Sequence, residues 1–195
     1  MLRPTSFLAS LIAFLSCTVC VKAQAPTPPG PGPEVRKLEI VVGKFTNEGA
    51  TIAGTMGPNS PAQKGISTED CRWVAGGFSV LCNITGKFVG RKVSTVALLY
   101  YDSSSKVYHY VSIDNGGEVQ TSTGSVNNNI WTWAGENSWG GTVTRTRYTM
   151  KPISKDSFEH TLESGDSESS MKPFMSGKKA RVTAANSSMS KPASR

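Results

Sequence analysis

The two histidines of the 195-residue chain, His109 and His160, are its most suggestive candidates for chemistry. Read as strands, in which alternate residues share a face, both segments place the imidazole among apolar side chains. Those neighbours are Val107, Val111 and Ile113 for His109, and Phe158 and Leu162 for His160. A histidine in an apolar pocket could act as a general base or ligate haem iron. A core histidine hydrogen-bonded to a neighbour is the favoured explanation of the pattern, so neither role is assigned.

Cys71 and Cys82 flank Gly76-Gly77, a dipeptide typical of a tight hairpin turn because both positions tolerate positive φ. Counting outward from this turn pairs residue 75 with 78, 73 with 80, and 71 with 82. The cysteines then face each other at roughly 5.5 Å between Cα atoms, which suits a disulfide. The sequence predicts a disulfide between them, with two free buried thiols as the alternative.

Trp131 and Trp133 alternate with Thr132 and point to one side of a predicted strand. They could form a platform on which a ligand stacks, or they could pack the interior as ordinary strand aromatics. Arg145 and Arg147 likewise share a face and could bind a carboxylate or form a surface stripe. Our candidate cavity residues are the aromatic and histidine side chains predicted to face inward: Trp73, Phe78, His109, Trp131, Trp133, Phe158 and His160.

Other catalytic signatures are missing from the sequence. It contains no G-x-S-x-G, no H-x-H, no H-E-x-x-H and no phosphate-binding glycine loop outside the Pro/Gly-rich segment. Most acidic residues lie at predicted turns or on polar faces, which does not favour a catalytic carboxylate pair. We therefore assign no catalytic residue, no metal site and no cofactor, and favour a protein that is not an enzyme.

The amino terminus has the form of a secretory signal peptide, with Arg3, an apolar run over residues 7–21 and a small residue at Ala23. We expect cleavage after Ala23 and export to the periplasm or the extracellular space. The apolar run is too short to span a bilayer, so no transmembrane segment is expected. Cys17-Thr18-Val19-Cys20 lies in this run and should leave with it.

Composition divides the remaining chain into three parts. Residues 24–33 are rich in Pro and Gly and predict an extended linker, residues 34–182 form the domain, and residues 183–195 predict a disordered basic tail. The domain opens with a short helix or 3₁₀ turn that Gly43 ends. Ten short β-branched and aromatic runs follow. We expect strands near residues 44–55, 64–75, 78–88, 92–101, 106–114, 117–126, 129–135, 141–151, 157–164 and 171–182.

Ten short strands with short connections predict an all-β fold, an antiparallel meander closed into a barrel of about 8–10 strands. Closure also removes the unpaired edges that an open sheet would expose.

Several motifs within residues 43–182 together resemble a known family. They are Gly43-x-Phe45, Cys71-Arg72-Trp73 with Gly76-Gly77-Phe78 and Cys82, Tyr101-Asp102 with Tyr108, Trp131-Thr132-Trp133, and Arg145-Thr146-Arg147-Tyr148. The chain is similar to the secreted bacterial proteins grouped as domain of unknown function 1579. The resemblance implies a lipocalin-like barrel and brings no established activity. Two departures are Phe45, where lipocalins have Trp, and Ser164-Gly165-Asp166-Ser167, where an Asp-Gly turn is expected.

The formal charge of +7 suggests nucleic-acid binding, but the distribution of the charged residues argues against it. Residues 24–177 carry 14 cationic and 14 anionic side chains, so the surplus lies in the signal peptide and the last 18 residues. We attribute the latter to a C-terminal tail and expect no nucleic-acid partner, leaving open a weak contact of the tail with anionic envelope surfaces. The cations in those 18 residues are Lys178, Lys179, Arg181, Lys191 and Arg195.

The leading hypothesis is an exported lipocalin-like barrel that binds a small apolar or amphipathic ligand in its interior. The alternative is a structural or protein-interaction module of the cell envelope. A haem-binding barrel and a histidine-dependent enzyme are further hypotheses.

Overall fold

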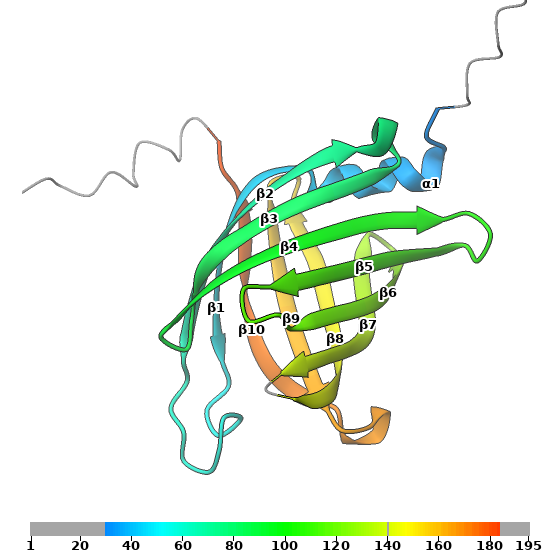
Figure 1. The fold of residues 1–195 in the computed structure, drawn as a ribbon. Coiled ribbons are helices and arrows are strands. Elements are labelled where there is room, and N and C mark those ends of the chain that lie inside the picture. Colours follow the sequence, from blue (N-terminus) through cyan, green and yellow to red (C-terminus); the bar gives the residue numbers. More distant parts are fainter. Residues whose placement is uncertain (1–29, 140, 184–195) are drawn as a thin grey trace, which may run out of the picture.

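The computed structural model describes residues 30–139 and 141–183, which form a closed barrel of ten antiparallel strands (Figure 1). Every strand pairs with its sequence neighbours, and β1 pairs with β10 to close the barrel. The prediction of an all-β, lipocalin-like meander barrel is confirmed. The strands are β1 (Gly43–Thr51), β2 (Lys64–Val74), β3 (Ser79–Phe88), β4 (Arg91–Asp102), β5 (Val107–Asp114), β6 (Val119–Asn127), β7 (Ile130–Trp139), β8 (Thr142–Ser154), β9 (Ser157–Gly165) and β10 (Lys172–Arg181).

The predicted hairpin around the two cysteines forms in the predicted register, with Cys71 opposite Cys82 and Trp73 opposite Val80. The turn itself differs. It is a 3₁₀ segment, η2 (Ala75–Gly77), and the last paired residues are Val74 and Ser79. A longer loop shifts the alternation of hydrogen-bonded and non-bonded pairs by one residue. The two Cα atoms are therefore 4.0 Å apart rather than the expected 5.5 Å.

A short N-terminal helical segment covers one end of the barrel, as predicted (Figure 1). It consists of α1 (Pro33–Arg36) and the 3₁₀ helix η1 (Lys37–Val41), with Leu38 fully buried. Two hydrogen bonds tie it to the wall: the Tyr108 hydroxyl donates to a Glu34 carboxylate oxygen at 2.8 Å, and Trp73 Nε1 donates to Glu39 at 2.7 Å. Because burial and contact hold this segment, it acts as a fixed plug.

The end of the barrel beneath the plug is filled with side chains; we call it the packed end. The Trp131 and Trp133 rings stack with centroids 5.8 Å apart, and Tyr108 meets Trp131 edge-on at 4.8 Å. Phe45 and Phe158 form a second edge-on pair at 6.1 Å. Aromatic pairs in these geometries bury large apolar areas and leave little free volume.

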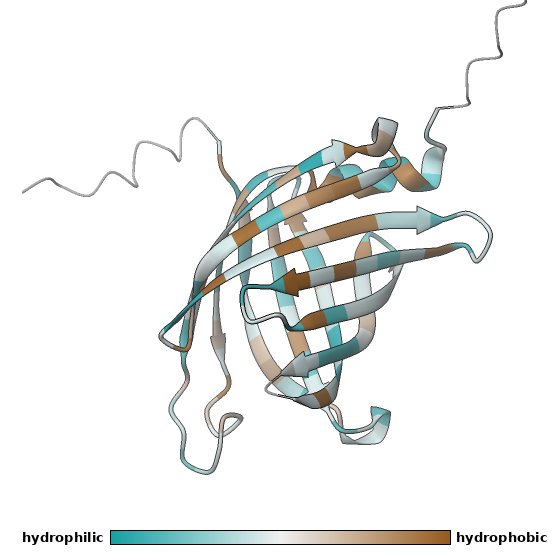
Figure 2. Cartoon of the chain, in the orientation of Figure 1, coloured by the Kyte–Doolittle hydropathy of each residue, from teal (hydrophilic) through white to brown (hydrophobic). Residues whose placement is uncertain are grey.

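The facing of β5 corrects the sequence prediction. Val111 and Ile113 are 39% and 51% exposed on the outer wall, while Tyr108 and Ser112 are buried inside. The tyrosines of β5 face inward because their large rings pack against Trp131 and Trp133 and fill the space at this end of the barrel. The outward residues instead form an apolar area with cross-strand neighbours, visible as brown segments on β4 and β5 in Figure 2. That area comprises Val96, Leu98, Val111, Ile113 and Val119.

No helix within residues 30–139 and 141–183 is long and apolar enough to cross a bilayer. The predicted signal peptide and most of the predicted linker and tail lie outside the described residues.

Candidate ligand site in the barrel interior

A cavity of about 580 Å³ occupies the end of the barrel opposite the plug; we call it the open end. All ten strands contribute to its lining, together with Met56 from the β1–β2 loop. The lining residues come from the strand ends that meet at the β1–β2, β3–β4, β5–β6, β7–β8 and β9–β10 connections. The barrel is therefore hollow in one half and filled in the other.

One wall of the cavity carries uncharged polar side chains in a row. Gln120 on β6 lies directly opposite Asn137 on β7, and Asn137 lies directly opposite Thr144 on β8. A second level continues the wall, with Thr146 opposite Ser164 on β9. We call Gln120, Asn137 and Thr144 the polar row; all three line the cavity.

The remaining lining is largely apolar. Ile84 and Phe88 on β3 and Val93 on β4 lie across the barrel from β8, and Leu162 and Met175 lie on β9 and β10. A cavity with mainly hydrophobic walls and a few convergent polar groups is the usual form of a small-molecule site.

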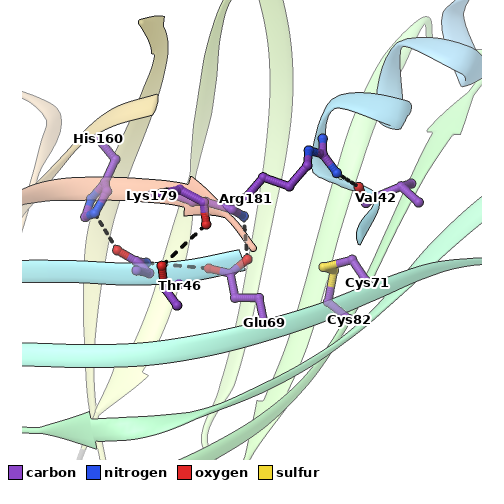
Figure 3. Close-up of polar contacts among 10 residues, drawn as sticks. Val42, Thr46, Glu69, Cys71, Cys82, His160, Lys179 and Arg181 are labelled. Carbon is purple, nitrogen blue, oxygen red and sulfur yellow. Dashed lines mark hydrogen bonds and ion pairs between the residues drawn. A yellow bond between two sulfur atoms is a disulfide. The ribbon is translucent and has the colours of Figure 1, made fainter. Parts of the chain in front are cut away.

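Beneath the cavity, between the open and packed ends, lies a buried polar cluster (Figure 3). Lys179 Nζ forms an ion pair with Glu69, and the two side chains are only 6% and 11% exposed. Asn47, which also lines the cavity, donates through Nδ2 to Glu69 at 3.5 Å and places Oδ1 2.7 Å from His160 Nε2. The cluster comprises Asn47, Glu69, His160 and Lys179.

His160 is 2% exposed, and its ring stacks on Tyr148 with centroids 5.5 Å apart. Burial lowers the pKa of His160, Glu69 opposes that shift, and Lys179 adds to it. With Asn47 accepting at Nε2, the neutral ring leaves Nδ1 as a bare acceptor. Among the described residues, this nitrogen has no hydrogen-bond partner. The imidazole is thus held neutral and fixed, deep in the barrel.

Two cations near the C-terminus lie inside the barrel rather than in a tail, which corrects the charge assignment. Lys179 and Arg181 sit over the Phe45 ring, each 4.5 Å from its centroid. Arg181 also pairs with Asp156 at 3.2 Å. Figure 3 shows its second contact, in which it donates to the Val42 carbonyl. A buried cation needs an anion, carbonyl or aromatic face, and β10 supplies these through its pairing with β1 and β9.

The seven residues predicted to line a cavity all lie outside the lining of the observed cavity. Trp131, Trp133 and Phe158 are buried in the packed end, and Trp73 packs against this core beside the plug. His160 lies in the polar cluster. None of the seven is among the residues that line the cavity.

Phe78 and His109 do not point inward at all. Phe78 is 44% exposed because it lies in the turn after η2 rather than on a paired strand. His109 shares the outward face of β5 and stacks on Tyr100 of β4 at 4.9 Å. The two histidines therefore do not meet across the barrel.

The remaining sequence candidates are structural. Cys71 and Cys82 form the predicted disulfide, buried beside the packed end. Arg147 pairs on the outer wall with Glu163 at 3.1 Å and with Glu168, and Arg145 is exposed. In the described part of the chain, no group of three or more His, Cys, Asp or Glu side chains could hold a metal ion.

The polar row and the partners of His160 were not predicted from the sequence. Strands β6 to β8 carry Thr, Ser, Asn and Gln on both faces, so alternation of hydropathy does not show which face is inside. The only signal was the absence of charge at Gln120, Asn137 and Thr144. Lys179 and Glu69 belong to distant strands and look like surface residues until closure brings them together.

A comparison with solved structures supports this architecture. Among curated proteins, none matches the chain. A crystal structure of Rv2717c from M. tuberculosis is similar with a TM-score of 0.54 at 14% identity, covering 78% of this chain and 99% of that one. An S-type phycobiliprotein lyase, CPES from Guillardia theta, has a TM-score of 0.49 at 12% identity, covering 77% and 96%. At 14% identity, the similarity to Rv2717c shows a shared fold and nothing about function. Residues 30–181 match a family model, and the chain therefore belongs to the family described as "Protein of unknown function (DUF1579)".

Proposed function

We propose that this protein binds a small apolar or amphipathic molecule in the open end of its barrel. The observation that carries the proposal is the cavity of about 580 Å³ lined by residues of all ten strands. Small-molecule pockets typically measure roughly 300–1,000 Å³ and are mostly apolar. A barrel whose interior were filled throughout would serve only as a scaffold, and here one half is hollow.

The arrangement of the two ends supports entry from one direction. The plug and the aromatic packing close one end, while the cavity reaches the connections at the other. A ligand would therefore enter between the strand connections and stop above the polar cluster.

The test is binding of the neutral fluorophore N-phenyl-naphthylamine, whose emission rises in apolar surroundings. Leu162 lines the cavity, and Leu98 lies on the outer wall, which gives a matched pair of leucines. Leu162→Trp should fill the cavity and weaken binding by about tenfold or more, whereas Leu98→Trp should leave it unchanged. Circular dichroism of both variants checks that the barrel is retained. No fluorophore binding to the wild type, or equal binding by both variants, would overturn the proposal.

Export to the periplasm or extracellular space is part of the same proposal. The predicted signal peptide supports it, and so does the Cys71–Cys82 disulfide, since disulfides persist in oxidising compartments. Intact mass measurement of protein expressed from the full sequence should show a chain beginning at Gln24 with both cysteines oxidised. A full-length chain retained in the cytoplasm would contradict export.

A further inference from the structure

We infer that the cavity selects an uncharged amphipathic molecule that carries hydroxyl or amide groups along one edge, with those groups set against the polar row. This inference rests on the proposed function and narrows its ligand class.

The first support is the register of the polar row. Gln120, Asn137 and Thr144 are direct cross-strand partners on three neighbouring strands, so their side chains stand beside one another at one level. Directly opposed residues have Cβ atoms about 4.5–5.5 Å apart. The three side chains can therefore contact neighbouring polar groups of one small molecule at the same time.

The second support is the unused hydrogen-bonding capacity of the row. Within residues 30–139 and 141–183, the side chains of Gln120, Asn137 and Thr144 form no hydrogen bond with the protein. Two amides and one hydroxyl can donate and accept several hydrogen bonds. A ligand that covers these partly exposed groups without pairing them must remove water from them at a cost in free energy, so a ligand that pairs them gains over one that does not.

The third support is that the buried charges beneath the cavity are paired with each other. Lys179 and Glu69 form a buried ion pair, and burial lowers the pKa of His160, which disfavours its charged form. An anionic headgroup that took Lys179 would leave the Glu69 carboxylate buried and unpaired, which is strongly unfavourable. Of the two charged residues in the lining, Asp114 accepts the Gly116 and Glu118 amides of its own turn, and Lys87 is solvent-exposed.

The opposite wall completes the assignment. Ile84, Phe88 and Val93 present apolar surface across from the polar row. A molecule that is polar along its whole length would place polar groups against this apolar surface. A plain hydrocarbon would leave the polar row without hydrogen-bond partners. The two walls together fit a molecule with one polar and one apolar edge.

The experiment compares three probes with the same twelve-carbon acyl chain, each used below the concentration at which it forms micelles or separates from solution, in displacing the fluorophore from the wild-type protein. Glycerol monolaurate is uncharged and carries hydroxyls, methyl laurate is uncharged without hydroxyls, and laurate is an anion. We expect glycerol monolaurate to reach half-displacement at a concentration about tenfold lower than either of the others. Equal potency of the three, or the greatest potency for laurate, would overturn the inference.

Variants of the polar row then test whether these residues cause the preference for glycerol monolaurate over methyl laurate. Thr144→Val keeps the shape of the side chain and removes its hydroxyl, and Asn137→Leu removes the amide at similar volume. Each should reduce the preference for glycerol monolaurate over methyl laurate by about fivefold, with both potencies measured against that variant's own fluorophore binding. Thr161→Val, at an exposed position on β9, is the matched control and should keep the preference. A preference unchanged in Thr144→Val and Asn137→Leu overturns the inference, whereas failure of the fluorophore to bind the wild type overturns the proposed function itself.

Discussion

At the scale of single residues, the most consequential contact is the buried ion pair between Lys179 and Glu69. Both side chains are almost fully enclosed, and Asn47 links the pair to His160. Charges taken out of water need a partner, and removing one partner leaves the other uncompensated. The pair therefore holds β10 and β2 to β1 from inside the barrel.

Lys179→Met should lower the free energy of unfolding by roughly 3–5 kcal/mol, because the Glu69 carboxylate is left buried without its cation. Urea denaturation followed by circular dichroism measures the change. The double variant Glu69→Gln with Lys179→Met should recover much of the loss. Lys178→Met, the neighbouring residue on the outer face of β10, is the control and should change stability little. A single variant as stable as the control would show that the pair is dispensable.

His160 makes stability depend on pH. Its pKa lies below the ordinary value of 6.5 in the folded protein, chiefly because burial disfavours the charged ring. The unfolded chain therefore binds a proton at higher pH than the folded one. Stability is full above the unfolded pKa and falls as the pH drops through it toward the folded pKa.

We expect the free energy of unfolding to decline between about pH 7.5 and about pH 5.5, and the decline to be smaller in His160→Gln than in the wild type. Urea titrations at several pH values across that window measure it. Hydrogen bonds from Lys37 and Tyr108 lower the pKa of Glu34, and hydrogen bonds from Ser104 and Ser105 lower the pKa of Asp102. The contributions of these two carboxylates to the free energy of unfolding are lost at lower pH than that of His160. His109→Gln, on the outer wall, should retain the wild-type decline. Identical pH profiles for His160→Gln and the wild type would contradict this assignment.

At the scale of elements, the N-terminal plug illustrates how a short segment can be held by tertiary contacts. A four-residue helix followed by a 3₁₀ turn has too few internal hydrogen bonds to be stable alone. Leu38, Val35 and Val41 bury their side chains against the packed end instead. The plug is therefore ordered because the barrel provides an apolar surface.

Leu38→Ala should lower the free energy of unfolding by about 2–5 kcal/mol, since it opens a cavity at a fully buried position. Thermal denaturation or urea titration measures the loss. Leu98→Ala, at a position 36% exposed on β4, is the matched control and should cost less than about 1 kcal/mol. Equal losses would mean that the plug does not stabilise the barrel.

Strand positions were predictable from the sequence, and strand faces were predictable only where hydropathy alternates cleanly. In β2 and β3 the cysteines, Trp73 and Val80 contrast with Asp70, Arg72 and Asn83, and the predicted facing is confirmed. In β5 both faces carry large apolar or aromatic residues. Hydropathy therefore does not show whether Val111 and Ile113 or Tyr108 and Tyr110 face the interior. The contacts with Trp133 decided the outcome, and those contacts cross three strands.

At the scale of the whole molecule, closure of the sheet creates the cavity. No single hairpin encloses it, because its lining comes from every strand. Occupation of the cavity should therefore stabilise the barrel as a unit.

A ligand that binds only the closed barrel should raise the free energy of unfolding by about 2.7 kcal/mol at a free concentration one hundred times its dissociation constant. Thermal unfolding with increasing N-phenyl-naphthylamine, or with glycerol monolaurate, measures the shift. Leu162→Trp should show little shift under the same conditions, and Leu98→Trp should shift like the wild type. A ligand that binds the wild type but does not raise its stability would contradict binding inside the barrel.

The sequence by itself determined the number and approximate limits of the strands, the helical opening, the pairing of Cys71 with Cys82 and the membership of one family. The strands, the helical opening and the cysteine pairing depend on local signals, namely turn residues, β-branched runs and a two-residue period, whereas the family was indicated by a resemblance of motifs. Only the tertiary structure decided which half of the barrel is hollow, that Lys179 pairs with Glu69 inside it, that His160 is buried while His109 is outside, and that Gln120, Asn137 and Thr144 form one row. Each of these depends on strands far apart in the sequence meeting across a closed sheet, where volume and charge must balance together, and no local pattern contains that balance.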